Sequence, residues 1–314
     1  MSLINKAMEI SPYPEMLLRR IYYSLRDRSS KLMVKQGGTI HKDAALCKTV
    51  NTEDFFEHLR SLGIKEGDIL IVHSSTEGLE RLDCRANELV EKLKALVGEN
   101  GTLVFPAFPD ENRLKEKDGI KVYHPQKSVA WTGMLPNLML RMKGAVRSEF
   151  PCNPLVAYGP HAKEMMSHNL ETDLAHSQNS CWGYCVSHHA RILYLGIPAY
   201  HSCTIVHTLE DYQPDFWPQD WYEQKEYIIS GITDKHIRVR VRAQKWSMYI
   251  AEKYSESSYI KNGLIRDADY QGINVRIIDD CNCFVNTILD HWMKYRFFHI
   301  PKRKMRWDKR IRKM

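Results

Sequence analysis

The sequence predicts an α/β fold with a mainly parallel, buried central sheet, a helical arm before it and a basic tail after it. Continuous apolar runs at 69–73 and 102–105 predict two buried strands, and residues 85–97 predict a helix between them. This strand–helix–strand order favours parallel strands joined by a right-handed crossover. With 314 residues, 43% of them hydrophobic, the chain is long enough for one large domain or two smaller ones.

The predicted elements extend on both sides of this unit. Thr52 is expected to begin a helix, because acidic residues fill its first turn, and Gly63 is expected to end it. A hairpin is predicted where apolar and polar residues alternate at 226–230 and again at 236–241. Further elements are a helix predicted at 131–142 and strands predicted at 155–158 and 192–197.

Three regions differ in composition, and we expect them to be separate parts of the protein. Residues 1–50 form an N-terminal arm in which 16–25 are apolar at helical spacing, with basic residues between them. Residues 51–293 hold the predicted sheet and its helices, and residues 294–314 form a basic, aromatic tail. No apolar run is long enough to span a membrane, and the N-terminus lacks the apolar core of a secretion signal. A cytoplasmic location is therefore expected.

The positive charge of the chain is concentrated in the tail. Ten Lys or Arg residues and one Asp give residues 294–314 a net charge of +9, whereas the whole chain carries +7 and the remainder therefore −2. Bases interleaved with aromatic side chains suit the anionic inner face of a membrane or another polyanion. A solvated tail without a partner is the alternative. Binding to nucleic acid would rest on the tail alone and is the least expected of these.

The eight cysteines are scattered, and they are expected to be reduced thiols in a chain without an export signal. Cys181, Cys185, His188 and His189 lie close together in the sequence, which invites comparison with a zinc site. Their spacing differs from the paired Cys-x2-Cys of structural zinc sites, and no second pair follows. We therefore expect no metal.

The segment after the strand at 192–197 carries the strongest chemical signal. If Thr204 begins a helix, His207 and Glu210 lie three residues apart on one face of it. A carboxylate beside an imidazole fixes its tautomer and raises its basicity, which prepares a general base near neutral pH. Open α/β sheets bind ligands beyond the carboxyl ends of their strands, so this position favours function. The alternative is a solvated surface pair.

A second polar segment, His73-Ser74-Ser75-Thr76, leaves the end of the first predicted strand. Small hydroxyl residues at that place let backbone amides approach an anionic or amide-rich ligand, and the hydroxyls add donors. An ordinary turn after a strand is the alternative.

Four sequence patterns occur in register between about residues 52 and 212. They are a Gly-Asp…Val-His-Ser-Ser pattern at 67–75, a Gly…Gly-Thr-Leu-Val-Phe-Pro pattern at 98–106, an Arg-Ser…Pro…Tyr-Gly-Pro pattern at 147–162 and a Leu-Gly…Thr…His…Glu pattern at 194–210. Together they resemble the aminoglycoside 3-N-acetyltransferase family. The region beyond 212 resembles the family only loosely.

The resemblance implies that this fold is a three-layer α/β sandwich, unrelated to the common acetyltransferase fold. It also implies transfer of acetyl from acetyl-CoA to an amino group on a sugar-like ring, without a metal. It assigns His207 as the base, Glu210 as its partner and Thr204 as a donor to the developing oxyanion. The residues that it places at the CoA site are His73, Ser74, Ser75, Thr76, Arg147 and Ser148.

The chain departs from the family pattern where the acceptor is expected to bind. Phe150 and Asn153 stand where relatives carry histidines, and with Asp110 and Asp211 they are expected to contact the acceptor. Aminoglycosides are polycations, whereas the body of this chain is nearly neutral. We therefore expect an amino sugar on a nucleotide or lipid carrier, used in surface polysaccharide synthesis. One alternative is an aminoglycoside acceptor and antibiotic resistance, another is a weakened, membrane-attached scaffold protein, and the oligomeric state is left open.

Overall fold

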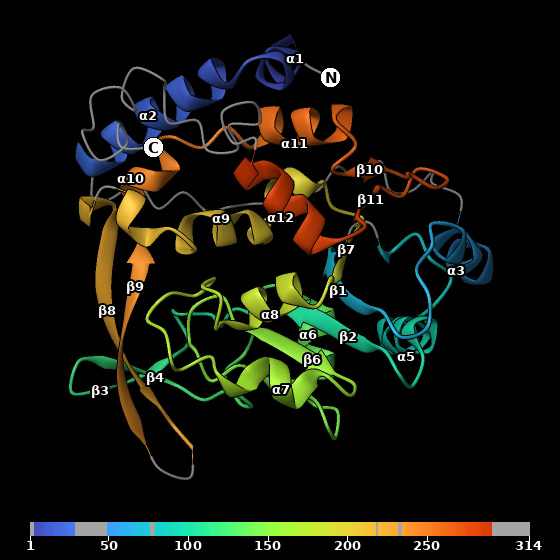
Figure 1. Ribbon diagram of the computed structural model, residues 1–314, viewed down its shortest axis with the longest axis horizontal. Coiled ribbons are helices and arrows are strands. Elements are labelled where there is room, and N and C mark those ends of the chain that lie inside the picture. The colour runs from blue at the N-terminus through green and yellow to red at the C-terminus, as the bar shows by residue number, and fades with distance from the viewer. Residues whose placement is uncertain (1–2, 29–48, 76–78, 218, 232–233, 291–314) are drawn as a thin grey trace.

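The computed structural model describes residues 3–28, 49–75, 79–217, 219–231 and 234–290 (Figure 1). A seven-stranded sheet lies at the centre, and a smaller four-stranded sheet stands at the left of the view. None of the helices in these ranges is both long and apolar enough to cross a lipid bilayer. Part of the predicted arm, at 29–48, and the predicted tail, at 294–314, lie outside the described residues.

The central sheet follows the strand order β10-β11-β7-β1-β2-β6-β5. β1 pairs in parallel with both β2 and β7, while β6 and β11 run antiparallel to their neighbours. The expected parallel sheet is confirmed in its three central strands, and five of the seven strands run in one direction. The strands are β1 (Ile69–Ser74), β2 (Thr102–Pro106), β5 (Val146–Arg147), β6 (Leu155–Tyr158), β7 (Arg191–Leu195), β10 (Arg266–Asp267) and β11 (Val275–Ile278).

Alternate side chains of β1 enter two separate hydrophobic cores, one on each face of the sheet. Ile69 and Ile71 face the first core, and Leu70 and Val72 face the second. A strand that is buried on both faces needs an unbroken apolar run, which is the pattern that predicted it. Helices complete both cores, which confirms the three-layer sandwich. The first core includes residues of α7 (Ala162–Ser167), α8 (Cys181–Ser187), α9 (Thr208–Asp211), α11 (Glu252–Lys261) and α12 (Cys281–Asp290), and the second includes residues of α3 (Thr52–Ser61), α5 (Ala86–Val97) and α6 (Met134–Met139).

The helix boundaries follow from local hydrogen bonds. α3 begins at Thr52 as predicted, and the Asn51 side chain caps it by accepting a backbone hydrogen bond at 3.0 Å. α6 is shorter than the predicted helix at 131–142. The Thr132 hydroxyl donates to a backbone carbonyl of β2 at 2.6 Å, and Gly133 has a φ of 125°, which an α-helix does not allow.

The smaller sheet, in the order β3-β4-β8-β9, contains the predicted hairpin. β8 and β9 pair antiparallel over eight residues each, so the hairpin is longer than predicted and β9 extends to Arg242. Phe150, Tyr227 and Val239 form a small core against it. The strands of this sheet are β3 (Lys115–Lys117), β4 (Ile120–Tyr123), β8 (Tyr222–Ile229) and β9 (Lys235–Arg242).

The N-terminal arm packs against α11, as the top of Figure 1 shows. Glu15 and Met16 are buried against the body. Arg19 donates to Glu252 of α11 at 2.7 Å and to Glu15 at 2.9 Å. These contacts fix which side of the second arm helix faces the body. The helices of the arm are α1 (Leu3–Ile10) and α2 (Pro12–Arg28).

His73, near the carboxyl end of β1, carries a buried imidazole. Its ring stacks on Tyr194 of β7 with 5.0 Å between the ring centres, and it lies 6.3 Å from the ring of Trp182. Burial disfavours the protonated form and lowers the pKa of His73 to about 3. The ring is therefore neutral in the folded protein at neutral pH.

We predict that the free energy of unfolding falls as the pH drops from about 6.5 towards 3, because unfolded His73 binds a proton that the folded state rejects. The loss expected from this residue is about 2 kcal/mol at pH 5. Urea unfolding at pH 7.5 and at pH 5 checks this, and His73→Gln should remove that part of the pH dependence. His168→Gln, at an exposed histidine, is the matched control. An equal effect of both substitutions would contradict the prediction.

Candidate active site

The chain that leaves β7 bends sharply before it reaches the predicted His–Glu pair. Gly196 has a positive φ of 69°, a conformation that favours glycine. The 3-10 turns η2 (Ala199–His201) and η3 (Thr204–His207) then lead into α9. The single helix expected from Thr204 is therefore a 3-10 turn followed by one α-helical turn. The pair comes to lie beyond the carboxyl end of a central parallel strand, where α/β sheets bind ligands.

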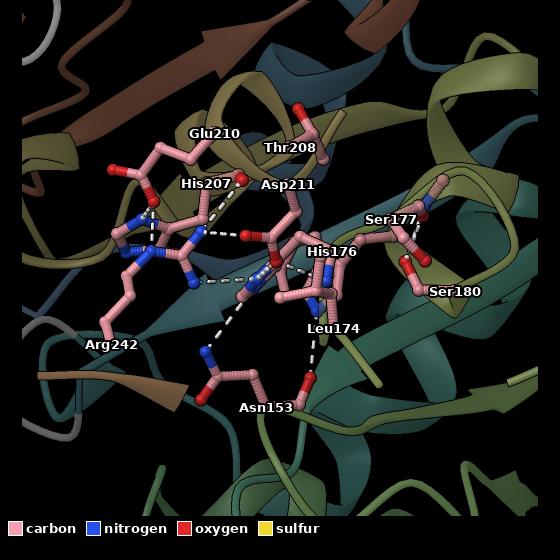
Figure 2. A network of polar contacts seen from close by, with 12 residues as sticks. Asn153, Leu174, His176, Ser177, Ser180, His207, Thr208, Glu210, Asp211 and Arg242 are labelled. Carbon is pink, nitrogen blue, oxygen red and sulfur yellow. Dashed lines mark hydrogen bonds and ion pairs between the residues drawn. The ribbon is translucent and has the colours of Figure 1, made fainter. Parts of the chain in front are cut away.

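His207 and Glu210 are in direct contact. His207 Nδ1 lies 3.0 Å from Glu210 Oε2 (Figure 2). The Glu210 side chain is fully buried, whereas 24% of the His207 side chain is exposed. The buried partner argues against the alternative of a solvated surface pair. Because the carboxylate accepts from Nδ1–H, the lone pair of the neutral ring lies on Nε2.

Arg242, the last residue of β9, is a counter-ion that the sequence did not reveal. Its Nε donates to Glu210 Oε2, and its Nη2 donates to Asp211 Oδ1 at 2.7 Å and to the His207 carbonyl at 3.0 Å (Figure 2). Burial disfavours the guanidinium charge, but attraction by Asp211 and Glu210 outweighs this effect and raises the pKa of Arg242. The alternation of apolar and polar residues predicts the hairpin, but it does not indicate that Arg242 pairs with Asp211, which lies 31 residues earlier.

A second acid–imidazole pair, also missed from the sequence, lies beside the first. Asp211 Oδ2 accepts from the His176 backbone amide at 3.0 Å and lies 3.2 Å from His176 Nδ1. Burial lowers the pKa of His176 to about 3, so this ring is neutral. Its centre lies 5.3 Å from that of His207, and its Nε2 lies 3.3 Å from Asn153 Nδ2. The family pattern has a histidine at the position of Asn153. In this chain the imidazole of His176, which comes from another segment, lies beside that position.

The network holds two buried carboxylates against one guanidinium. Burial favours the neutral acid, but Arg242 and the contacts of His176 outweigh this effect and lower the pKa of Asp211 to about 2. Because His176 is neutral, the two carboxylates of Glu210 and Asp211 face a single positive charge, that of Arg242. The network therefore has an excess of one negative charge. A proton taken up by His207 would be offset by this excess negative charge.

His207 lies where two hollows meet. The smaller, of about 130 Å³, lies among η2, η3 and α11, and Thr204 lines it. The larger, of about 470 Å³, lies between the β8–β9 hairpin and the loop after β2, and Trp131 and Asn153 line it. His207 and Ile250 line both. An imidazole in this position can exchange a proton with groups bound on either side.

The loop predicted to contact CoA is tied to the turn before the His–Glu pair. The Ser75 hydroxyl donates to the Gly196 carbonyl, which joins the end of β1 to the turn after β7. Ser74 is partly exposed, and His73 is buried. Thr76 lies outside the described residues.

Arg147 and Ser148 occupy the protein interior rather than an exposed ligand surface. Arg147 is 1% exposed, and its guanidinium donates to the backbone carbonyls of Ala107 and of Ser128, the latter at 2.6 Å. Ser148 is fully buried, and its hydroxyl contacts the Asn169 side chain. In this arrangement the guanidinium joins β5 to the segments at Ala107 and Ser128.

Three of the four residues expected at the acceptor do not line the larger hollow. Phe150 is buried in the small core against the hairpin, and Asp211 is buried in the ion network. Asp110 pairs with the nearby Arg113 at 3.2 Å. Asn153 does line the hollow, at a φ of 50°, which Asn tolerates better than most residues. The sequence pattern predicted the hairpin but did not indicate that it packs over Phe150.

Within the described ranges, no group of three or more His, Cys, Asp or Glu side chains is arranged to hold a metal ion. Cys181 and Cys185 lie in the first core, where burial raises the pKa of Cys181 to about 12. His188 and His189 are exposed. The two cysteines of the Cys181–His189 segment therefore lie in the core, and its two histidines lie at the surface.

The sequence matches the family model for aminoglycoside 3-N-acetyltransferase over residues 71–283. Similar proteins include aminoglycoside N(3)-acetyltransferase IX of Micromonospora chalcea, 28% identical over 167 residues, which are 48% of this chain and 58% of that protein. Aminoglycoside N(3)-acetyltransferase III of Serratia marcescens is 28% identical over 176 residues, which are 52% of this chain and 64% of that protein. The match thus spans less than two thirds of the length of these relatives.

Solved structures share the fold of this chain. AAC-IIIb in a binary complex with CoASH has a TM-score of 0.65 and 19% identity, over 81% of this chain and 99% of that one. AAC(3)-Xa has a TM-score of 0.68 and 20% identity, over 80% of this chain and 94% of that one. AAC-VIa bound to sisomicin has a TM-score of 0.65 and 17% identity, over 81% of this chain and 100% of that one. These TM-scores establish a common fold, and at such low sequence identities they establish the fold alone.

We expect Arg242→Met to lower the free energy of unfolding by about 3–5 kcal/mol, because it leaves two buried carboxylates without their counter-ion. Arg238→Met is the matched control on the same strand, since Arg238 is 75% exposed and pairs with Glu226 at the surface. The control should cost at most about 1 kcal/mol. Urea unfolding at pH 7.5 measures both values, and similar small losses would show that the network does not depend on Arg242.

Proposed function

Because the chain belongs to the aminoglycoside 3-N-acetyltransferase family, we propose that it transfers an acetyl group from acetyl-CoA to an amino group of an aminoglycoside or a related amino sugar. The observation that carries this proposal is the His207–Glu210 pair, with its buried carboxylate and its imidazole at the meeting of two hollows. An imidazole in this setting suits removal of a proton from an amine. The proposed location is the cytoplasm.

In the proposed reaction, His207 Nε2 accepts a proton from the attacking amine. The amine nitrogen bonds to the thioester carbonyl carbon, the carbon–sulfur bond breaks, and the sulfur leaves as a thiolate. His207 then returns the proton to this thiolate, so the ring ends the cycle neutral. Glu210 holds the ring and balances its transient charge. General-base catalysis of this kind contributes about 10²–10⁴-fold to the rate.

Thr204 is the proposed donor to the oxyanion of the tetrahedral intermediate. Its side chain lines the smaller hollow together with His207. Its hydroxyl lies 3.3 Å from the Ser202 carbonyl, a long contact that a stronger acceptor can replace. An oxyanion is such an acceptor. Ser74 and Ser75 are proposed to contact CoA, because the Ser75 loop is tied to the turn that leads to Thr204.

The comparisons favour an aminoglycoside acceptor over the nucleotide- or lipid-linked amino sugar expected from charge alone, because the similar proteins are aminoglycoside N(3)-acetyltransferases. Glu111 and Glu223 supply carboxylates to the larger hollow. Lys225 and Arg240 line the same hollow, and Lys225 lies 3.4 Å from Glu111. This mixed lining suits an acceptor with few ammonium groups better than one with many.

Turnover against a panel of amines tests the proposed substrate class. Release of CoA thiol is followed with gentamicin, apramycin, sisomicin and a nucleotide-linked amino sugar, and the acetylated nitrogen is located by NMR. We expect acetylation of at least one aminoglycoside. Turnover of the nucleotide-linked sugar alone would contradict the aminoglycoside acceptor and support an amino sugar on a carrier. Binding of acetyl-CoA without any turnover would favour the weakened family member.

We predict that His207→Ala lowers kcat by about 10²–10⁴-fold with little change in the KM for acetyl-CoA, because only proton removal is lost. Added imidazole should restore part of the rate in His207→Gly. His188→Ala, at an exposed histidine away from both hollows, is the control and should keep the full rate. An unchanged kcat in His207→Ala would show that the assigned base is wrong.

A further inference from the structure

The outer surface of the arm exposes an unusual amount of apolar side chain. Of the eleven large hydrophobic residues that are exposed in the described ranges, eight belong to α1 and α2. Soluble proteins seldom gather so many exposed apolar side chains without a partner. The arm lies outside residues 71–283, which match the family model. We name as the arm face the six of these residues on α2, which are Tyr13, Leu17, Leu18, Ile21, Tyr22 and Leu25.

The spacing of the arm face makes it a broad stripe. Tyr13, Leu17, Ile21 and Leu25 repeat every fourth residue, so each advances about 40° around the helix. Leu18 and Tyr22 form a second row beside them, and the stripe covers about half of the circumference. One packed helix covers a narrower stripe. A flat, extended apolar medium therefore fits the arm face better than a second helix does.

The opposite side of α2 fixes this orientation. Glu15 is 7% exposed, and Arg19 joins it to Glu252 of α11. The Lys253 backbone amide also donates to Glu15 at 3.2 Å. Because the polar contacts of α2 are directed at the body, the arm face is directed at its surroundings.

Charge favours an anionic partner for the arm face. Among the side chains of α2 that the structure describes, Glu15 is the one carboxylate, and it is buried and paired. Arg20 lies beside the apolar stripe and is exposed, and its guanidinium is 6.0 Å from the ring centre of Tyr249 of the body. Tyr13 and Tyr22 are amphipathic rings of the kind that lie at the level of lipid headgroups. The sequence of the tail adds a net charge of +9 with interleaved aromatic residues.

We propose that the arm face lies on an anionic lipid surface and holds the protein there peripherally. The apolar stripe enters the boundary between headgroups and acyl chains, while the exposed Arg20 at its edge and the basic residues of the tail are attracted to the phosphates. Stable attachment of this kind takes an apolar anchor together with basic residues, and this chain has both. The proposal goes beyond acetyl transfer and does not depend on it.

Flotation with lipid vesicles tests the proposal on the full chain. The probes are vesicles of phosphatidylcholine alone and of phosphatidylcholine with phosphatidylglycerol at 3:1. We expect binding to the anionic vesicles and weaker binding to the neutral ones. The double substitution Leu17→Gln with Ile21→Gln should weaken binding by about tenfold or more, because two apolar anchors are lost while the tail is unchanged.

Matched controls separate the arm face from general hydrophobicity and from misfolding. Val129→Gln with Met134→Gln removes two exposed apolar side chains from the body, at 47% and 46% exposure, and should leave binding unchanged. Thermal melts of both variants should match that of the unsubstituted protein. The proposal is overturned if this protein does not bind anionic vesicles or if the arm variant binds as tightly as it does. It is also overturned if light scattering finds a dimer that the arm variant dissociates, since a second copy would then occupy the face.

Discussion

The Arg242 guanidinium, held between Glu210 and Asp211, is the interaction on which the rest of the site depends. Two adjacent carboxylates buried at the end of a short helix would repel one another and favour protonation without a cation beside them. The cation comes from the end of a long hairpin that belongs to the second sheet. The ionisation of the two carboxylates therefore depends on the position of that hairpin.

The sheet places this network where chemistry can occur. β7 is a central parallel strand, and the chain after it must turn away from the core, which brings His207 to the meeting of two hollows. Glu210, Asp211 and His176 lie behind it and are buried. A rigid, buried set of partners with one accessible imidazole is the arrangement that a general base needs, because reorganisation during proton transfer is costly.

The arm and the body differ in where they place their apolar side chains. The interior of the body is apolar on both faces of the sheet, and its buried carboxylates Glu210 and Asp211 contact Arg242. α2 differs from this pattern, because its ion pair is directed inwards and the six apolar residues of the arm face are directed outwards. Since an exposed apolar stripe costs free energy in water, its presence on the arm indicates that the surroundings of α2 differ from those of the body.

The sequence by itself determined the parallel pairing of β1 with β2 and the His207–Glu210 contact, because each depends on residues that lie near one another in the chain. The sandwich followed from the resemblance to the family. Apolar runs define strands buried on two faces, and a spacing of three places two side chains on one side of a turn. Only the tertiary structure decided that Arg242 and His176 join this pair, and that Arg147 and Asp211 are buried rather than exposed. Ion pairing and burial depend on contacts between distant segments, and local periodicity carries no information about which segments meet.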